Sequence, residues 1–89
     1  MIYYVYILQS FKNDKLYIGH TDNLIRRLEE HNTGRGGKYT RQNKPWKLLY
    51  SEEHPDRSSA AKRETYLKST KGSQEKKKLA GILPKEYQV

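Results

Sequence analysis

The stretch YVYIL at residues 4–8 and the stretch LYIGHT at residues 16–21 decide the fold. Both place tyrosine among aliphatic residues, a composition that favours β-strands. Residues 2–9 are apolar or aromatic on both of the faces that alternate along a strand, which predicts a central strand covered on both sides. The turn-forming segment SFKNDK is short, so it predicts an antiparallel hairpin with a second strand over residues 15–20.

The tyrosines of these two strands are the first candidate site residues. A hairpin that turns at Phe11 and Lys12 places Tyr6 opposite Tyr17, and paired residues project from the same face of a sheet. A buried tyrosine needs a partner for its hydroxyl group. The two tyrosines therefore either anchor the fold or face a bound molecule, and tyrosines that only pack are the simpler alternative.

The remaining segments predict helices and one further strand. In chain order we expect a helix that Thr21 or Asp22 caps and that runs to about His31, a loop, a strand over residues 46–53, a helix over residues 59–70 and a short basic helix over residues 73–79. The first helix carries an apolar stripe of Leu24, Ile25 and Leu28. This order predicts an α+β fold, in which helices flank a small three-stranded, mostly antiparallel sheet.

Length and composition indicate one small domain. The 89 residues contain no cysteine, which excludes disulfides and thiolate metal sites. We expect one domain over residues 1–83 and a C-terminal tail over residues 84–89. The longest apolar run, MIYYVYIL, is too short to span a bilayer and lacks a basic leader. We therefore expect a cytoplasmic protein with no membrane partner, monomeric in isolation.

The net charge of +8 creates a positive field that attracts polyanions. Nucleic acid is the commonest such partner; an anionic membrane surface and simple solubility are the alternatives. Residues 34–44 form a glycine-rich, cationic segment, predicted either to bind nucleic acid or to be a mobile loop. Because it lacks the G-K-[ST] ending of a P-loop, nucleotide hydrolysis of that type is excluded. The expected contacts with phosphates and bases are Arg35, Lys38, Tyr39, Arg41 and Lys44 in this segment, and His20, Lys68 and Lys71 outside it.

Glu64 interrupts the face of the second long helix on which Ala60 and Leu67 stand at helical spacing. A carboxylate directed at the core must be paired or bound to a metal ion, since burying it alone is costly. Glu64 is therefore either a metal ligand or a partner of Arg27 or Lys68 in a structural salt bridge. Other acidic residues lack this core-facing position, so we expect one ion rather than two.

Arg27 and His31 lie one turn apart at the edge of the first helix's apolar stripe. Arginine can hold a phosphate with two hydrogen bonds and histidine can move a proton, although such a pair can also be a solvated surface feature. A tyrosine that acts as a base near pH 7 needs its pKa lowered by roughly three units, about 4 kcal/mol. Burial acts in the opposite direction, so Arg27, His20, His31 or a metal ion would have to lower it.

Together these features resemble the GIY-YIG nuclease family. Its two namesake tripeptides appear here as YVY at residues 4–6 and YIG at residues 17–19. The stretch YIGHTDNLIRRLEEHNTG is similar to the family's most recognisable segment, and AAKRETYLK is similar to the helix that carries its metal-binding glutamate. The resemblance covers residues 2–72 and is strongest to small stand-alone members, which are similar to the nuclease subunit of branched-DNA resolving complexes.

The resemblance implies a role for each matching residue. Tyr6 and Tyr17 match the motif tyrosines, one of which activates water in the family's proposed mechanism. Arg27 matches the arginine that stabilises the phosphate, and His31 stands where members carry histidine or tyrosine. Glu64 matches the single metal ligand. The implied activity is a DNA endonuclease that hydrolyses phosphodiester bonds with one Mg²⁺ or Mn²⁺ ion, on branched or damaged DNA.

Further positions match the family pattern or depart from it. Gly19 matches the motif glycine, and His20 stands where some relatives carry lysine. Tyr4 replaces the first motif glycine. Many family nucleases carry an asparagine beyond the glutamate helix, whereas this chain has none after Asn43. The alternatives are therefore a nucleic-acid-binding module with weak or no catalysis, or a subunit that a protein partner activates and targets.

Overall fold

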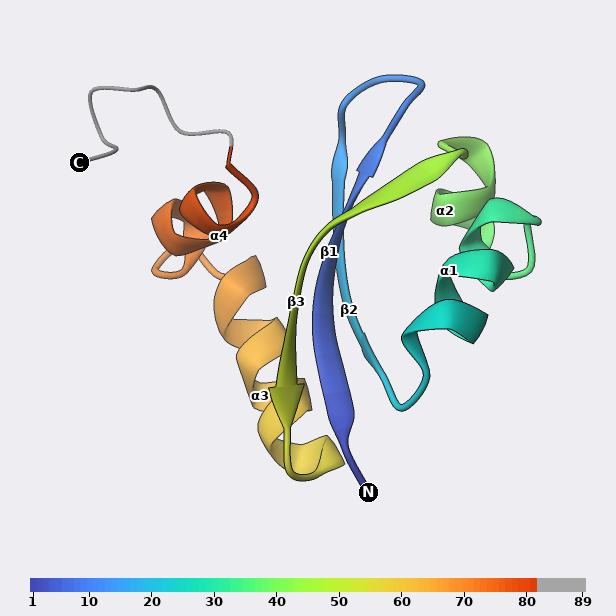
Figure 1. Cartoon of the computed structure of the whole chain (residues 1–89). Coiled ribbons are helices and arrows are strands. Elements are labelled where there is room, and N and C mark those ends of the chain that lie inside the picture. The colour runs from blue at the N-terminus through green and yellow to red at the C-terminus, as the bar shows by residue number, and fades with distance from the viewer. Residues whose placement is uncertain (82–89) are drawn as a thin grey trace.

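The computed structural model describes residues 1–81, and Figure 1 shows the arrangement of their strands and helices. The elements in chain order are β1 (Tyr3–Ser10), β2 (Leu16–Thr21), α1 (Leu24–Asn32), α2 (Lys38–Gln42), β3 (Trp46–His54), α3 (Arg57–Lys68) and α4 (Ser73–Leu79). The expected α+β fold is confirmed. The boundary of the predicted C-terminal tail lies outside the described residues.

The sheet has three strands in the order β2-β1-β3, and both pairings are antiparallel. The predicted register of the hairpin is wrong: Tyr6 pairs with Gly19, and Tyr17 pairs with Leu8. The turn is wider than two residues because the Ser10 hydroxyl accepts hydrogen bonds from the backbone N–H groups of Lys12 and Asn13. The two tyrosines still project from the same face, since Tyr6 and Leu8 are two residues apart.

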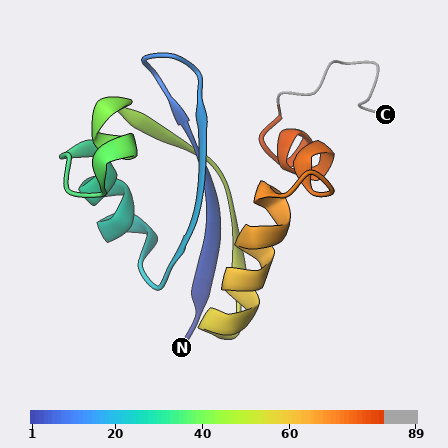
Figure 2. The same cartoon turned by 180° about the vertical axis from the view of Figure 1, so that it is seen from behind.

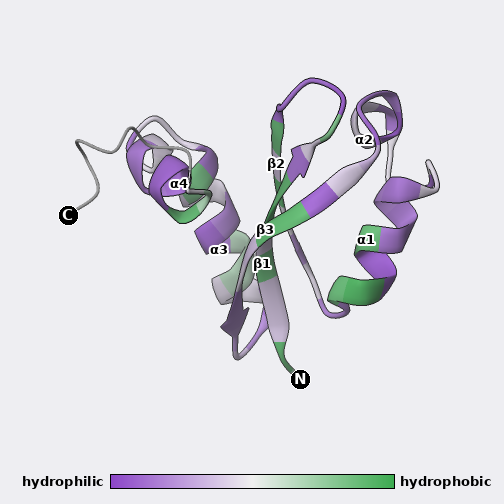
Figure 3. Ribbon diagram, turned by 45° about the horizontal axis from the view of Figure 1, so that its top comes forward, coloured by the Kyte–Doolittle hydropathy of each residue, from purple (hydrophilic) through white to green (hydrophobic). Residues whose placement is uncertain are grey.

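Helices cover both faces of the central strand, as its two apolar faces predicted. On one face, Val5 and Ile7 of β1 pack with Ala60 and Leu67 of α3. On the other, Tyr6 and Leu8 pack with Trp46 and with the inner side of α1. Figures 1 and 2 show α3 and α4 on one side of the sheet and α1 and α2 on the other. Figure 3 shows hydrophobic residues concentrated where the strands cross, between mainly hydrophilic helices.

The capping residue and the buried face of helix α1 both differ from the prediction. Asn23 is its cap, because the Asn23 side chain accepts a hydrogen bond of 3.0 Å from the backbone N–H of Arg26. Ile25 is 83% exposed, so the predicted apolar stripe is wrong at this position. The buried face instead follows the i, i+4, i+7 spacing of Leu24, Leu28 and His31, and His31 is completely buried.

A short helix, α2, lies inside the segment predicted as a loop. A residue of β3 holds this helix in place, because the indole N–H of Trp46 donates a hydrogen bond of 2.8 Å to the carbonyl of Thr40. The predicted second long helix, α3, begins at Arg57, because Asp56 caps it by accepting a hydrogen bond from the backbone N–H of Ser59. Helix α4 has the predicted bounds. None of the helices in residues 1–81 combines the length and the hydropathy that a membrane span requires.

Candidate active site

The candidate site is built around β2, which is an edge strand of the sheet. Side chains alternate along a strand, so Tyr17 and Gly19 face the α1 layer while His20 faces the α3 layer. Because no further strand covers this edge within the described part of the chain, groups from both layers can meet beside it. The edge strand thus brings residues that are distant in sequence to one surface.

Tyr6 is the buried phenol of the site, with 2% of its surface exposed. Its hydroxyl shares a hydrogen bond of 3.0 Å with Nε2 of His31. Burial and the neighbouring Tyr17 raise the pKa of Tyr6 to about 12, and the Arg27 guanidinium only partly opposes them. Tyr6 is therefore protonated near pH 7, which suits a positioning hydrogen bond better than the role of a base.

His31 is neutral at physiological pH. Burial, followed by the nearby Arg27 charge, lowers the pKa of His31 to about 4. Its Nδ1 has no hydrogen-bond partner among the described residues, while its Nε2 contacts Tyr6. His31 was predicted at the edge of the apolar stripe of the helix. It lies instead inside the core, where the hydrogen bond between its Nε2 and the Tyr6 hydroxyl holds the Tyr6 ring in position.

Tyr17 is the more accessible phenol and lies at the centre of an aromatic cluster. Its ring centroid is 4.9 Å from that of His31 and 6.2 Å from that of Tyr39, which stacks on it. The Lys68 ammonium lies 5.9 Å from the Tyr17 ring centroid. Tyr17 therefore connects the α1 layer, the short helix α2 and the end of α3.

Gly19 is required by the position of the Tyr6 ring. A Cβ atom at Gly19 would overlap the Tyr6 hydroxyl oxygen and would lie 2.7 Å from Tyr6 Cζ and 3.2 Å from Tyr17 Cε2. The Tyr6 phenol thus lies directly against the backbone of β2. The reason for glycine in this motif is close packing, since its backbone does not need a positive φ.

Arg27 projects from α1 beside the two tyrosines. Its guanidinium donates a hydrogen bond of 2.9 Å to Glu30 and one of 3.5 Å to the carbonyl of Gly36. The Arg27 side chain is 31% exposed. A guanidinium has five N–H donors, so these two contacts leave donors for an anion at the open side.

Glu64 is half-buried on α3 and has a partner on each carboxylate oxygen. Its Oε1 lies 2.6 Å from Nδ1 of His20, and its Oε2 accepts a hydrogen bond of 2.7 Å from Lys68. Burial opposes ionisation, but the hydrogen bonds from Lys68 and His20 outweigh it and lower the pKa of Glu64. Of the two partners considered from the sequence, Lys68 is the one observed, and Glu64 keeps 19% of its side chain exposed.

The residues of the site offer a metal ion one carboxylate, that of Glu64. No cluster of three or more histidine, cysteine, aspartate or glutamate side chains occurs within residues 1–81. Magnesium is often bound by one or two carboxylates together with water and substrate phosphates, so the ionised, partly exposed Glu64 carboxylate fits one such ion. Lys68 would have to release Oε2 for the ion, and its side chain is 50% exposed and able to move.

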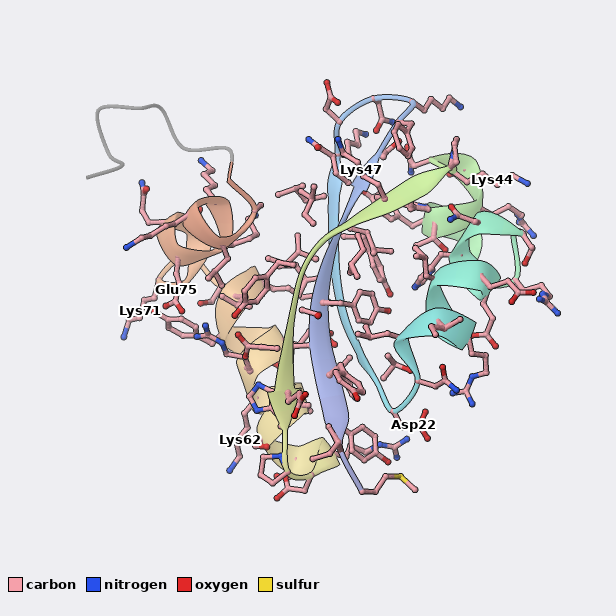
Figure 4. The ribbon with its side chains drawn as sticks, viewed as in Figure 1. Asp22, Lys44, Lys47, Lys62, Lys71 and Glu75 are labelled. Carbon is pink, nitrogen blue, oxygen red and sulfur yellow. The ribbon has the colours of Figure 1, made fainter. Side chains whose placement is uncertain are left out.

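The predicted nucleic-acid contacts do not gather at one place. His20 and Lys68 lie in the site as partners of Glu64, and Tyr39 lies there through its stacking on Tyr17. Figure 4 places Lys44 and Lys71 on opposite sides of the molecule. Arg35 is 3.6 Å from Glu29, while Lys38 and Arg41 are exposed on α2.

A hollow beside the site contains residues that the sequence reasoning missed. His20 and Arg27, which belong to the site, line it together with Tyr3, Arg26 and Arg57. Its volume is about 300 Å³. Tyr3 belongs to the same face of β1 as Val5, and its strand alternation could have placed it there. No sequence signal indicated Arg57.

Comparisons with known proteins identify relatives of this chain. A family model described as "GIY-YIG catalytic domain" matches residues 2–78. A UPF0213 protein of Clostridium perfringens is 48% identical over 65 residues, which cover 73% of this chain and 69% of the relative. One of Natronomonas pharaonis is 43% identical over 67 residues, covering 75% and 78%. The solution NMR structure of a UPF0213 protein from Bacillus halodurans matches with a TM-score of 0.53 and 32% identity, covering 98% of this chain and 90% of that one.

Proposed function

The chain belongs to the GIY-YIG family, and we propose that it is a metal-dependent endonuclease that hydrolyses phosphodiester bonds in DNA. Family membership indicates nuclease activity, with DNA as the implied substrate. One observation carries the proposal for this chain: Tyr6, Tyr17, Arg27 and Glu64 come from four separate elements and lie near one another, with Tyr6 buried against the backbone of the edge strand β2. This is the arrangement that a positioned phosphate and an attacking water require.

The residues divide the chemistry between them. Tyr17, the accessible phenol, orients the water that attacks phosphorus, and Tyr6 and His31 hold the Tyr17 ring in place from inside. Arg27 binds a non-bridging oxygen and stabilises the charge that develops there as the bond to the leaving oxygen breaks. Glu64 would hold one Mg²⁺ or Mn²⁺ ion, which when bound stabilises negative charge on the leaving oxygen.

The second candidate function is a nucleic-acid-binding module of the same fold. The contacts of Glu64 favour it, because His20 and Lys68 occupy both of its oxygens, and no cluster of three or more metal-ligating side chains occurs within residues 1–81. In that case the positive charge would bind DNA without cleavage, or a protein partner would supply targeting and complete the site.

Cleavage assays separate these candidates. Labelled flap, fork, junction and linear DNAs are incubated with Mg²⁺ or Mn²⁺ and with the wild type, Glu64→Gln or Tyr17→Phe. Glu53→Gln, an exposed acid on β3, is the matched control. We expect metal-dependent products from the wild type and Glu53→Gln, and loss of cleavage with retained DNA binding in Glu64→Gln. Binding without cleavage of any substrate would reject the nuclease and favour the module.

A further inference from the structure

The hollow next to the candidate site lies where β1 begins and α3 starts. His20 and Arg27 belong both to this hollow and to the site, so the two are continuous. Tyr3 and Arg57 line the same hollow, and Arg57 is the first residue of α3, about two helical turns before Glu64. Figure 4 labels Asp22 at the corner between β2 and α1, which borders the same hollow.

Three guanidinium groups line this hollow, and they differ in what they contact. Arg26 donates a hydrogen bond of 2.8 Å to Asp22, and Arg27 donates one of 2.9 Å to Glu30. Arg57 instead lies over the ring of Tyr3, with its guanidinium carbon 5.8 Å from the ring centroid. Among residues 1–81 Arg57 has no ion pair and no side-chain hydrogen bond, so its N–H donors remain available.

We propose that Tyr3 and Arg57 form a subsite for a second backbone phosphate of the nucleic acid, next to the phosphate that Arg27 binds. The proposal rests on the proposed function, because the same strand must occupy both positions. Stacking on an aromatic ring holds a guanidinium while leaving the N–H donors on its edge free for the two oxygens of a phosphate. A fixed second phosphate would align the strand along the edge of β2.

The chemistry of the hollow favours a phosphate over a base. Tyr3 is partly buried against the core and has the Arg57 guanidinium over its ring at 5.8 Å, so it offers a base less open aromatic surface than an exposed tyrosine would. Asp22 and Glu30 neutralise Arg26 and Arg27 in part, which leaves Arg57 as the uncompensated charge of the hollow. A backbone phosphate is the anionic group that every nucleic acid presents there, whatever its sequence.

Salt-dependent binding tests the subsite. The affinity of a labelled DNA duplex is measured by fluorescence anisotropy in EDTA, so that no cleavage occurs, between about 50 and 200 mM salt. The variants are Arg57→Gln, Tyr3→Leu and the control Lys62→Gln, an exposed cation on the same helix that Figure 4 places away from the sheet. Thermal unfolding of each variant shows whether it is folded.

For Arg57→Gln we expect binding about five- to tenfold weaker and a log–log salt slope smaller by about one. Tyr3→Leu should weaken binding less, because it removes the platform and leaves the charge. A folded Arg57→Gln that binds like Lys62→Gln, or a wild type that binds no DNA, overturns the subsite. If Arg57 proves irrelevant while Glu64-dependent cleavage persists, the subsite alone is rejected; Arg57-dependent binding without cleavage rejects only the nuclease.

Discussion

Replacing Gly19 by alanine tests whether the Tyr6 ring is held against the backbone of β2. The new methyl group would overlap the Tyr6 hydroxyl, and it would lie 2.7 Å from Tyr6 Cζ and 3.2 Å from Tyr17 Cε2. Both rings are packed against His31, so neither can move without loss of contacts. Overpacking of this kind costs about 1–3 kcal/mol of unfolding free energy.

For a domain of this size, 1 kcal/mol lowers Tm by about 4–8 °C, so Gly19→Ala should lower it by roughly 8–16 °C if the cost is about 2 kcal/mol. Circular dichroism at 222 nm follows the unfolding, and cleavage should fall together with the displaced tyrosines. Tyr6→Phe removes the overlapping oxygen, so the double variant should lose less stability than the two single losses combined. A Gly19→Ala protein with wild-type Tm and activity would refute the packing argument.

Three further predictions follow from the site. Tyr6→Phe removes the hydrogen bond to His31 Nε2 beside an Nδ1 that already lacks a partner, so urea unfolding should give a loss of about 1–3 kcal/mol; no loss would contradict the buried contact. The pKa of His31 is lowered to about 4 in the folded protein, so between about pH 6.5 and pH 4 the unfolded chain binds more protons than the folded one. The free energy of unfolding should therefore fall over this pH range, by at most about 3 kcal/mol. The variant His31→Asn should lack this part of the pH dependence. Lys68→Met frees Glu64 Oε2, so calorimetry should detect Mn²⁺ binding about two- to fivefold tighter than in the wild type, whereas weaker binding would show that Lys68 does not compete with the ion.

The sequence predicted the strands because their pattern is local, but the hairpin register depends on a side chain. Alternation along β1 and β2 was enough to place Tyr6 and Tyr17 on one face. The alternation did not determine which residues pair across the hairpin, because the Ser10 hydroxyl widens the turn by accepting hydrogen bonds from the turn backbone. A prediction that assumes a two-residue turn contains no sign of these hydrogen bonds. A register error of this kind leaves the face correct and moves the opposing residue from Tyr17 to Gly19.

The site was partly predictable for the same reason. Helical spacing correctly directed Glu64 toward the sheet, and it offered Lys68, one turn away, as a partner. It could not offer His20, which is 44 residues away and meets Glu64 only because β2 is an edge strand. The burial of His31 and the exposure of Ile25 likewise depend on how α1 is rotated against the sheet, which tertiary packing decides.

We propose above all that Tyr17 and Glu64 act on the same phosphodiester bond as parts of a single site. Single-turnover cleavage by Tyr17→Phe, Glu64→Gln and the double variant, with DNA binding measured in parallel, tests it most directly. Residues that act as a unit give non-additive losses, so we expect the double variant to be no slower than the slower single variant. Losses that multiply in the double variant, or cleavage that either single variant leaves unchanged, would contradict the claim.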